Sequence, residues 1–231
     1  MKQGKGLELD RVIFIGRTMA EYARFFNLDL QGLRGKRVLD CPGGASSFRA
    51  EAVAQGIDAV ACDIMYGPAA DELHERGLAD IDYVFEKFDG AGDMFIWKHY
   101  ADKSELIKTR KRALSGFAKD YAGKGGYVHG RLPRLPFIDN EFDIALSANL
   151  MFMYSDKLDF DFHVESIREL LRVAKEVRIF PLVMLNGAPY EKIEEIVEIF
   201  NVGGLQAKIE SVPYEFQRGA NRMLKISRPA W

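Results

Sequence analysis

Two carboxylates, each placed after a short apolar run, are the residues of this sequence best suited to bind a ligand. Asp40 ends the run Val38-Leu39, and small residues follow it in the turn Cys41-Pro42-Gly43-Gly44-Ala45-Ser46-Ser47. Asp63 ends a second apolar run, Ala59-Val60-Ala61-Cys62. A turn of small residues lets backbone N–H groups approach a ligand, and the second acid can accept protons from both hydroxyls of a ribose. The pattern is typical of a strand, turn, helix and strand that bind a nucleoside.

The elements that position these residues alternate between strand and helix. Apolar runs predict strands over 36–40, 59–63, 127–129, 142–147 and 176–185, the last interrupted by Pro181. Helical spacing of apolar residues predicts helices over 18–26, 47–55, 68–76, 104–121, 162–173 and 190–200. Two further strand candidates, 206–214 and 223–227, flank a hairpin turn at 217–221. We expect an α/β three-layer sandwich with a Rossmann-like, mostly parallel sheet and an antiparallel C-terminal element.

One stretch is too long for this alternation. From Ile64 to Tyr127 there are 64 residues before the next strand, whereas a βαβ unit needs only about 30. The excess holds an aromatic-rich part, 82–100, and a basic amphipathic helix with Ser104 as its expected N-cap. We assign its charged face to Lys108, Arg110, Lys111 and Arg112. The sequence therefore predicts a single domain over 1–231 with a helical and aromatic insertion over 65–127.

Composition narrows the class of protein. The 231 residues carry a net charge of −2, whereas proteins that bind duplex nucleic acid usually have a strong basic excess. The two cysteines, Cys41 and Cys62, lie at expected strand ends without the spacing of a zinc site, which favours buried thiols in a reducing cytoplasm. The run 12–15 is too short for a signal core, and nothing approaches a membrane span. We expect a cytoplasmic protein with no membrane partner, no metal and no nucleic-acid partner.

Five features then follow one another in a recognisable order. They are the turn after Val38, Asp63, Gly130-Arg131-Leu132 with Leu135-Pro136-Phe137, Phe142-Asp143-Ile144-Ala145-Leu146-Ser147, and Glu169-Leu170-Leu171-Arg172-Val173. On these residues the chain resembles, over 36–185, the class I S-adenosylmethionine (SAM) dependent methyltransferases of the methyltransferase type 11-like group. The resemblance implies a seven-stranded sheet whose last strand is antiparallel, SAM as cofactor, and methyl transfer to a small-molecule acceptor.

The resemblance also implies which residues bind the cofactor. Asp40 would organise the methionine end of SAM above the turn, and Asp63, with Ile64 beside it, would take the ribose hydroxyls. The other implied contacts are Pro42, Gly43, Gly44, Ala45, Ser46, Arg131, Leu132, Ser147, Ala148 and Asn149. The chain departs from the family at Pro42, Gly44 and Ser46, which stand at three glycine positions, with Gly43 added. Arg131 stands where the family places an acid, and a guanidinium cannot accept the adenine amino proton.

No general base is obvious in the sequence. His99, in the aromatic part of the insertion, and Tyr154 are the candidates for a catalytic role, and Arg17 is a candidate to meet the cofactor carboxylate. His163 ends an acidic run, for which stabilisation of a helix N-terminus is a simpler account than a metal site. The insertion is expected to form a lid whose aromatic residues suit an aromatic or apolar acceptor, unless they only pack the extra helix on the body.

Other functions stay open at this point. A first alternative is an RNA or protein methyltransferase that docks its substrate on the basic segment 108–112. A second is a protein that binds SAM or another nucleoside without catalysis. A third is a nicotinamide-dependent oxidoreductase, which the first turn and second acid permit, although the order of the later motifs argues against it.

Overall fold

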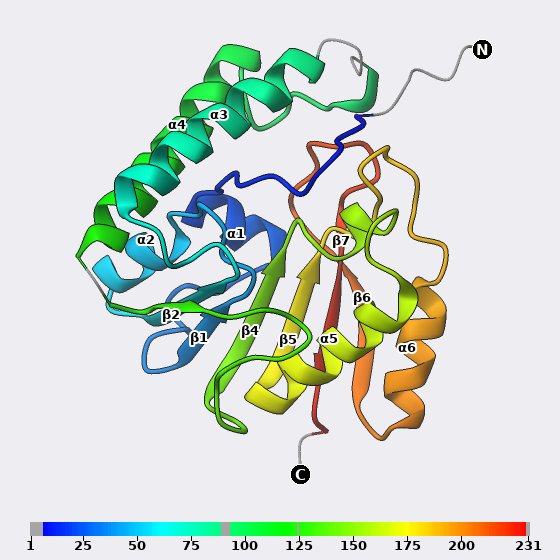
Figure 1. Ribbon diagram of the computed structural model, residues 1–231. Coiled ribbons are helices and arrows are strands. Elements are labelled where there is room, and N and C mark those ends of the chain that lie inside the picture. Colours follow the sequence, from blue (N-terminus) through cyan, green and yellow to red (C-terminus); the bar gives the residue numbers. More distant parts are fainter. Residues whose placement is uncertain (1–6, 89–92, 124, 230–231) are drawn as a thin grey trace.

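A single seven-stranded sheet forms the centre of the molecule (Figure 1). The computed structural model describes residues 7–88, 93–123 and 125–229, so residues 1–6, 89–92, 124 and 230–231 of the expected domain and insertion lie outside it. The strands, in chain order, are β1 Arg37–Asp40, β2 Asp58–Asp63, β3 Tyr127–His129, β4 Phe142–Ala148, β5 Ala174–Phe180, β6 Gln206–Ser211 and β7 Arg222–Ser227.

The strand order is β3-β2-β1-β4-β5-β7-β6, and the first five strands are parallel. β7 runs antiparallel to both β5 and β6, which confirms the expected C-terminal hairpin. β5 ends at Phe180, so the strand expected over 176–185 is wrong at its far end; Pro181 cannot donate to a ladder. The carboxyl ends of β1, β2 and β4 lie together at one end of the sheet, with β1 between β2 and β4.

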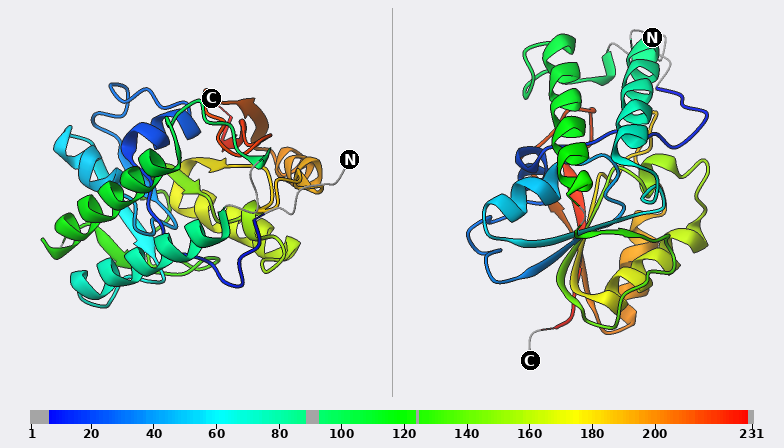
Figure 2. Two further views of the ribbon diagram at one scale, coloured as in Figure 1. Left: turned by 90° about the horizontal axis from the view of Figure 1, so that it is seen from above. Right: turned by 60° about the vertical axis from the view of Figure 1, so that its left-hand side comes forward.

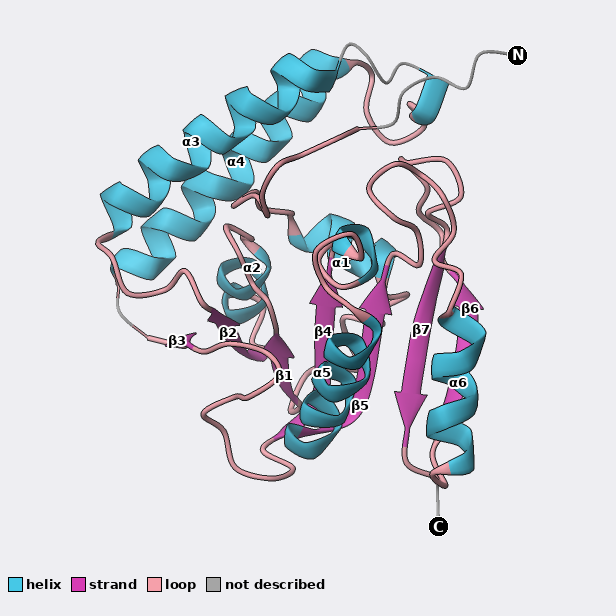
Figure 3. Cartoon of the chain, turned by 45° about the vertical axis from the view of Figure 1, so that its right-hand side comes forward, coloured by secondary structure: helices cyan, strands magenta, loops and turns pink. Residues whose placement is uncertain are grey.

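Helices cover both faces of the sheet, which confirms the three-layer arrangement. α1 (Met19–Phe25) and α2 (Phe48–Ala54) lie on one face, and α5 (Phe160–Val173) and α6 (Ile193–Val202) lie on the other (Figure 3). The core under α1 and α2 is rich in aromatic rings; Phe25, for example, stacks on Phe180 with ring centroids 4.6 Å apart. The core under α5 and α6 is mainly aliphatic.

The insertion forms a helical hairpin above the carboxyl edge of the sheet. Helices α3 (Ala70–Lys87) and α4 (Lys103–Ala122) lie side by side there (Figure 2). α3 is longer than the expected helix 68–76, because Ile81 and Phe85 continue its buried face. The N-cap of α4 is Asp102, which accepts from the Glu105 N–H at 2.8 Å, so the assignment to Ser104 is wrong. No helix in the described ranges is both long and apolar enough to cross a membrane.

After α3 the chain crosses the loop that joins β6 to β7. The Ile96 N–H donates to the Phe216 carbonyl at 2.7 Å, and the Arg218 N–H donates to the Met94 carbonyl at 2.8 Å. The Phe95 ring stacks between Phe88, at 4.0 Å, and Phe216, at 4.9 Å. The aromatic part of the insertion is therefore attached to the C-terminal hairpin, at the end of the sheet where the first turn also lies.

Candidate functional site

The turn between β1 and α2 requires small residues at its centre. A Cβ on Gly43 would lie 2.6 Å from the Tyr66 hydroxyl and 3.1 Å from the Ala61 Cβ. Gly44 has φ +51, in the left-handed region that glycine adopts without strain. The Gly44 N–H donates to a carboxylate oxygen of Asp63, the last residue of β2, at 2.8 Å. The first turn and the second acid are thus brought into direct contact, as their spacing predicts.

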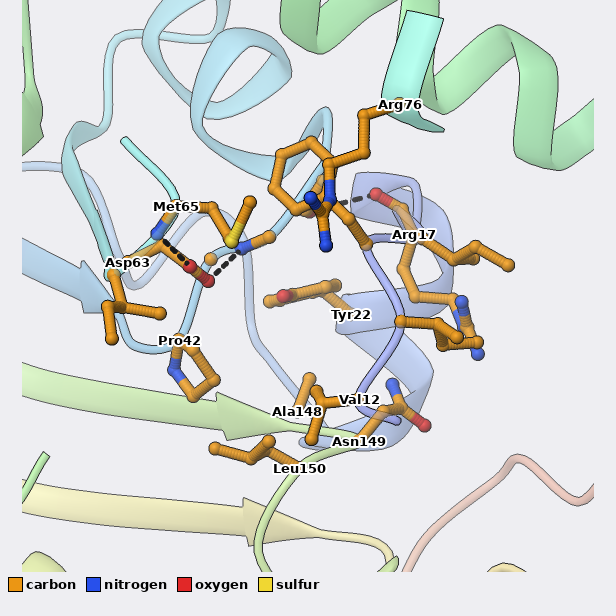
Figure 4. A pocket seen from close by; sticks show the side chains of 17 residues that line it. Val12, Arg17, Tyr22, Pro42, Asp63, Met65, Arg76, Ala148, Asn149 and Leu150 are labelled. Carbon is orange, nitrogen blue, oxygen red and sulfur yellow. Dashed lines mark hydrogen bonds between the residues drawn. The ribbon is translucent and has the colours of Figure 1, made fainter. Parts of the chain in front are cut away.

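A cleft opens beside this contact, at the carboxyl ends of β1, β2 and β4 (Figure 4). Eight residues predicted from the sequence line it: Pro42, Gly43, Gly44, Ser46, Asp63, Ile64, Ala148 and Asn149. Arg17 lines it as well. The topological position is the one at which open α/β sheets bind ligands.

Asp63 presents acceptor atoms to this cleft. Its two oxygens accept from the Met65 N–H and the Gly44 N–H, each at 2.8 Å. Burial raises the pKa of the carboxyl, while these two hydrogen bonds and His129 oppose that rise. Each carboxylate oxygen has a second lone pair, so Asp63 can accept further hydrogen bonds from a ligand.

Asp40 lies beneath the turn and does not line the cleft. One of its oxygens accepts from the Tyr22 hydroxyl at 2.8 Å, and the other is buried with no hydrogen-bond partner. Burial raises the pKa of Asp40 well above its usual value, although the bond from Tyr22 opposes this. Tyr22 itself lines the cleft, so Asp40 acts on the cleft by holding that ring. Ala45 and Ser147 are also buried behind the lining.

Arg131 and Leu132 are not brought to the cleft. Arg131 is exposed, and Leu132 packs with Cys41 and Cys62 in the core on the α5 face of the sheet. The adenine contact implied for them stays a prediction. The apolar side chains of Ile64, Met65 and Leu150 line the cleft instead.

Donor groups lie on the side of the cleft away from Asp63 (Figure 4). The Arg17 guanidinium donates to the Gly16 carbonyl at 3.2 Å and lies 4.0 Å from a Glu21 oxygen. Asn149 has φ +56 at the end of β4, and its side-chain nitrogen is buried with no partner. The cleft therefore offers an acceptor at one end and donors at the other, a pairing that fits a ligand with ribose hydroxyls at one end and a carboxylate at the other.

The candidate catalytic residues lie away from the cleft. The His99 ring stacks on Tyr214 at 4.7 Å, and burial together with Arg24 and Lys98 lowers its pKa. Tyr154 is buried, which raises its pKa to about 12. His163 pairs with the Tyr190 hydroxyl at 2.9 Å and the Met151 carbonyl at 3.2 Å. Across the part of the chain that the structure describes, no group of three or more His, Cys, Asp or Glu side chains could hold a metal ion.

The sequence reasoning missed the segment that precedes α1. Residues 12–15 line the cleft while the chain passes between the α3–α4 hairpin and the sheet (Figure 1). The Phe14 N–H donates to Asp80 of α3 at 2.6 Å, and the Ser47 N–H donates to the Arg17 carbonyl at 3.0 Å. In the sequence this segment is marked by a run of apolar residues. Such a run is typical of any buried strand, so it does not indicate that the segment lines a cleft.

A Gly16→Ala substitution tests this packing. The added Cβ would overlap the Ala45 carbonyl, which is backbone and cannot rotate away. We expect the free energy of unfolding to fall by about 1–3 kcal/mol in urea titrations, the usual cost of overpacking. Gly125→Ala is the matched control, because nothing lies within 4 Å of its Cβ position. Equal stability of the two variants would contradict the close approach.

Comparison with known proteins adds one relative and a fold. No protein-family model matches the chain. It is 33% identical over 224 residues, 96% of its length and 99% of the other chain, to the uncharacterized protein MJ0045 of Methanocaldococcus jannaschii. The structure of magnesium protoporphyrin IX methyltransferase from Synechocystis PCC 6803 with bound SAM aligns with a TM-score of 0.50 and 13% identity, over 91% of this chain and 78% of that one. A TehB-like SAM-dependent methyltransferase from Corynebacterium glutamicum has a TM-score of 0.44 and 16% identity, over 87% and 84%. At 13% identity the alignment with the magnesium protoporphyrin IX methyltransferase shows that the fold is shared, and nothing more.

Proposed function

The chain belongs to the family of the Methanocaldococcus jannaschii protein MJ0045 and has the class I methyltransferase fold, and we propose that it transfers a methyl group from SAM to a small organic acceptor. One observation carries the proposal. The Asp63 carboxylate lies in a cleft at the carboxyl edge of the sheet and is held there by backbone N–H groups of Gly44 and Met65. It is an acceptor placed for two vicinal hydroxyls.

The other residues of the cleft support the same ligand. Gly43 and Gly44 keep the floor of the cleft free of side chains, and the unpartnered side-chain nitrogen of Asn149 supplies a donor for a carboxylate at the opposite end. When bound, SAM would supply a methyl group on a sulfonium, whose carbon the acceptor attacks in line while S-adenosylhomocysteine leaves. The chain would contribute alignment of the acceptor and exclusion of water, the main requirements of such a displacement.

We favour a small acceptor over RNA because the insertion covers the carboxyl ends of the strands, where the cleft lies. The α3–α4 hairpin and the aromatic segment between its two helices lie above the carboxyl ends of the strands, and the space beneath them is lined mainly by apolar side chains. The exposed cations Lys108, Lys111 and Arg112 lie on α4. A non-catalytic SAM-binding role remains the second candidate, because no histidine, lysine or cysteine lines the cleft among the described residues.

Isothermal calorimetry with SAM, S-adenosylhomocysteine and NAD tests the proposal. We expect both adenosyl sulfur compounds to bind in a 1:1 complex and NAD not to bind. A panel of organic acids, phenols and amines with radiolabelled SAM would then test transfer. Binding of NAD instead of SAM would overturn the proposal, and tight SAM binding without transfer to any acceptor would favour the non-catalytic role.

A further inference from the structure

A second cavity lies directly against the cleft and shares a wall with it. It lies between the sheet, the α3–α4 hairpin and the loop that joins β6 to β7. Ile13, Ile15, Arg17 and Asn149 line both spaces. A molecule in the second cavity would therefore lie next to a ligand of the cleft, beside these four residues.

The lining of the second cavity is mainly apolar, with rings from α1, the insertion, the end of β5 (Phe180) and the loop before β7. Phe25 comes from α1, Phe88 and Phe95 come from the insertion, and Tyr214 and Phe216 come from the loop before β7. The polar side chains in the lining are two arginines, Arg17 and Arg110, one asparagine and one glutamine. No acidic side chain of the described chain lines it. Flat apolar molecules suit such walls, because rings stack on rings.

Two arginines line the second cavity, and a single carboxylate, that of Glu21, lies close to both of them. Glu21 is buried behind the cavity; one of its oxygens accepts from Arg110 at 2.7 Å and from the Tyr100 hydroxyl, and the other accepts from the Thr18 N–H at 2.9 Å. Arg17 lies 4.0 Å from that same carboxylate, so one anion faces two guanidinium groups. Burial and the neighbouring Arg110 lower the pKa of Arg17.

An incompletely neutralised guanidinium at a partly buried position needs an anion. The Arg17 side chain is 21% exposed, and its hydrogen bond to the Gly16 carbonyl uses one donor of five. Desolvation of such a charge is costly unless it is paired. A carboxylate or similar group on a ligand can pair with two guanidinium N–H groups at once.

We propose that the second cavity binds the methyl acceptor, and that the acceptor is a flat, ring-bearing organic acid whose anionic group is held by Arg17. That the ligand is a methyl acceptor rests on the proposed function. That it is an aromatic anion rests only on the residues that line the second cavity. The rings of the insertion and of the β6–β7 loop enclose the apolar body of the acid. Arg17, at the shared wall, places the anionic end of the acid next to the cleft.

A pair of fluorescent probes tests the ligand chemistry without SAM. Anilinonaphthalene sulfonate is an aromatic anion, and phenylnaphthylamine has the same ring system without the charge. We expect saturable 1:1 binding of the sulfonate to the wild-type chain that S-adenosylhomocysteine does not displace. Arg17→Gln should weaken sulfonate binding by at least about tenfold, as expected for one lost charge-assisted interaction, and change binding of the neutral amine by less than about twofold.

Arg24→Gln is the matched control, because Arg24 is exposed on α1 and lines neither space. Arg17→Lys should recover part of the sulfonate affinity, and thermal melting checks the fold of each variant. The proposal is overturned if Arg17→Gln affects both probes equally or neither, or if S-adenosylhomocysteine displaces the sulfonate. It is also overturned if Arg17→Gln lowers only SAM affinity. Absence of SAM binding to the wild-type chain would overturn the proposed function instead, and the probe result would still stand.

Discussion

An Asp63→Asn chain is expected to bind SAM at least about 100-fold more weakly than the wild-type chain. Each hydrogen bond from a ribose hydroxyl to a charged carboxylate contributes about 1.5–3 kcal/mol, and a loss of about 2.8 kcal/mol is 100-fold in affinity. The amide removes the charge and replaces one acceptor by a donor, which would face the Gly44 or Met65 N–H. Calorimetric titration of both chains at neutral pH measures the difference.

The pH dependence of SAM binding gives a second test of the same residue. Burial raises the pKa of Asp63, so its carboxylate takes up a proton at a higher pH than an ordinary aspartate. SAM affinity of the wild-type chain should therefore fall as the pH drops through that raised pKa. The Asp63→Asn chain has no carboxylate at this position and should lack that fall.

Asp58→Asn is the matched control for Asp63. Asp58 begins the same strand, β2, but its side chain is 64% exposed and pairs with Arg37 at 3.6 Å. Its amide variant should bind SAM within about twofold of the wild-type chain, since it changes only a surface pair. An Asp63→Asn chain with unchanged melting temperature and SAM affinity within about threefold of wild type would contradict the assigned ribose contact.

The parallel part of the sheet could be predicted because its signals are local. β4 is buried along most of its length, and such a strand appears as a nearly continuous apolar run, as in the expected strand 142–147. The contact between the first turn and Asp63 could also be predicted, because two adjacent parallel strands bring their carboxyl ends together. The predicted parallel strands and the predicted contact between the first turn and Asp63 are enough to locate the cleft.

The insertion could not be predicted in the same way, because its charged residues have distant partners. Asp80 interrupts the apolar face of α3 and favours an early end to that helix, but it is buried against the Phe14 N–H and Arg11. Arg110 was assigned to the charged outer face of α4, and this is wrong: it points inward to Glu21. Neither pairing leaves a pattern of spacing in the sequence, since the partners are separated by 66 to 89 residues.

An Arg110→Met chain is expected to lose about 3–5 kcal/mol of its free energy of unfolding, because the substitution removes the closest countercharge of a buried carboxylate. The side chains of Arg110 and Glu21 are 5% and 3% exposed and lie 2.7 Å apart, joining α4 to α1. Burial alone would raise the pKa of Glu21, but Arg110, Arg17 and the Thr18 N–H bring it to about 2. An acid whose pKa is lowered on folding stabilises the native state above its unfolded pKa. This contribution should be complete above about pH 4.5 and lost as the pH falls toward about 2. Urea titrations across this range measure both effects.

Arg112→Met is the matched control, because Arg112 lies two residues further along α4 and is exposed. Its effect on the free energy of unfolding should stay within about 0.5 kcal/mol. In the double variant Glu21→Gln/Arg110→Met the carboxylate and its nearest guanidinium are both absent, so the carboxylate that Arg110→Met strands is no longer present; Arg17 keeps its hydrogen bond to the Gly16 carbonyl. The double variant should therefore be less destabilised than the sum of its two single variants, by about 1–3 kcal/mol. Strict additivity, or an Arg110→Met chain as stable as Arg112→Met, would mean that the pair does not hold α4 against α1.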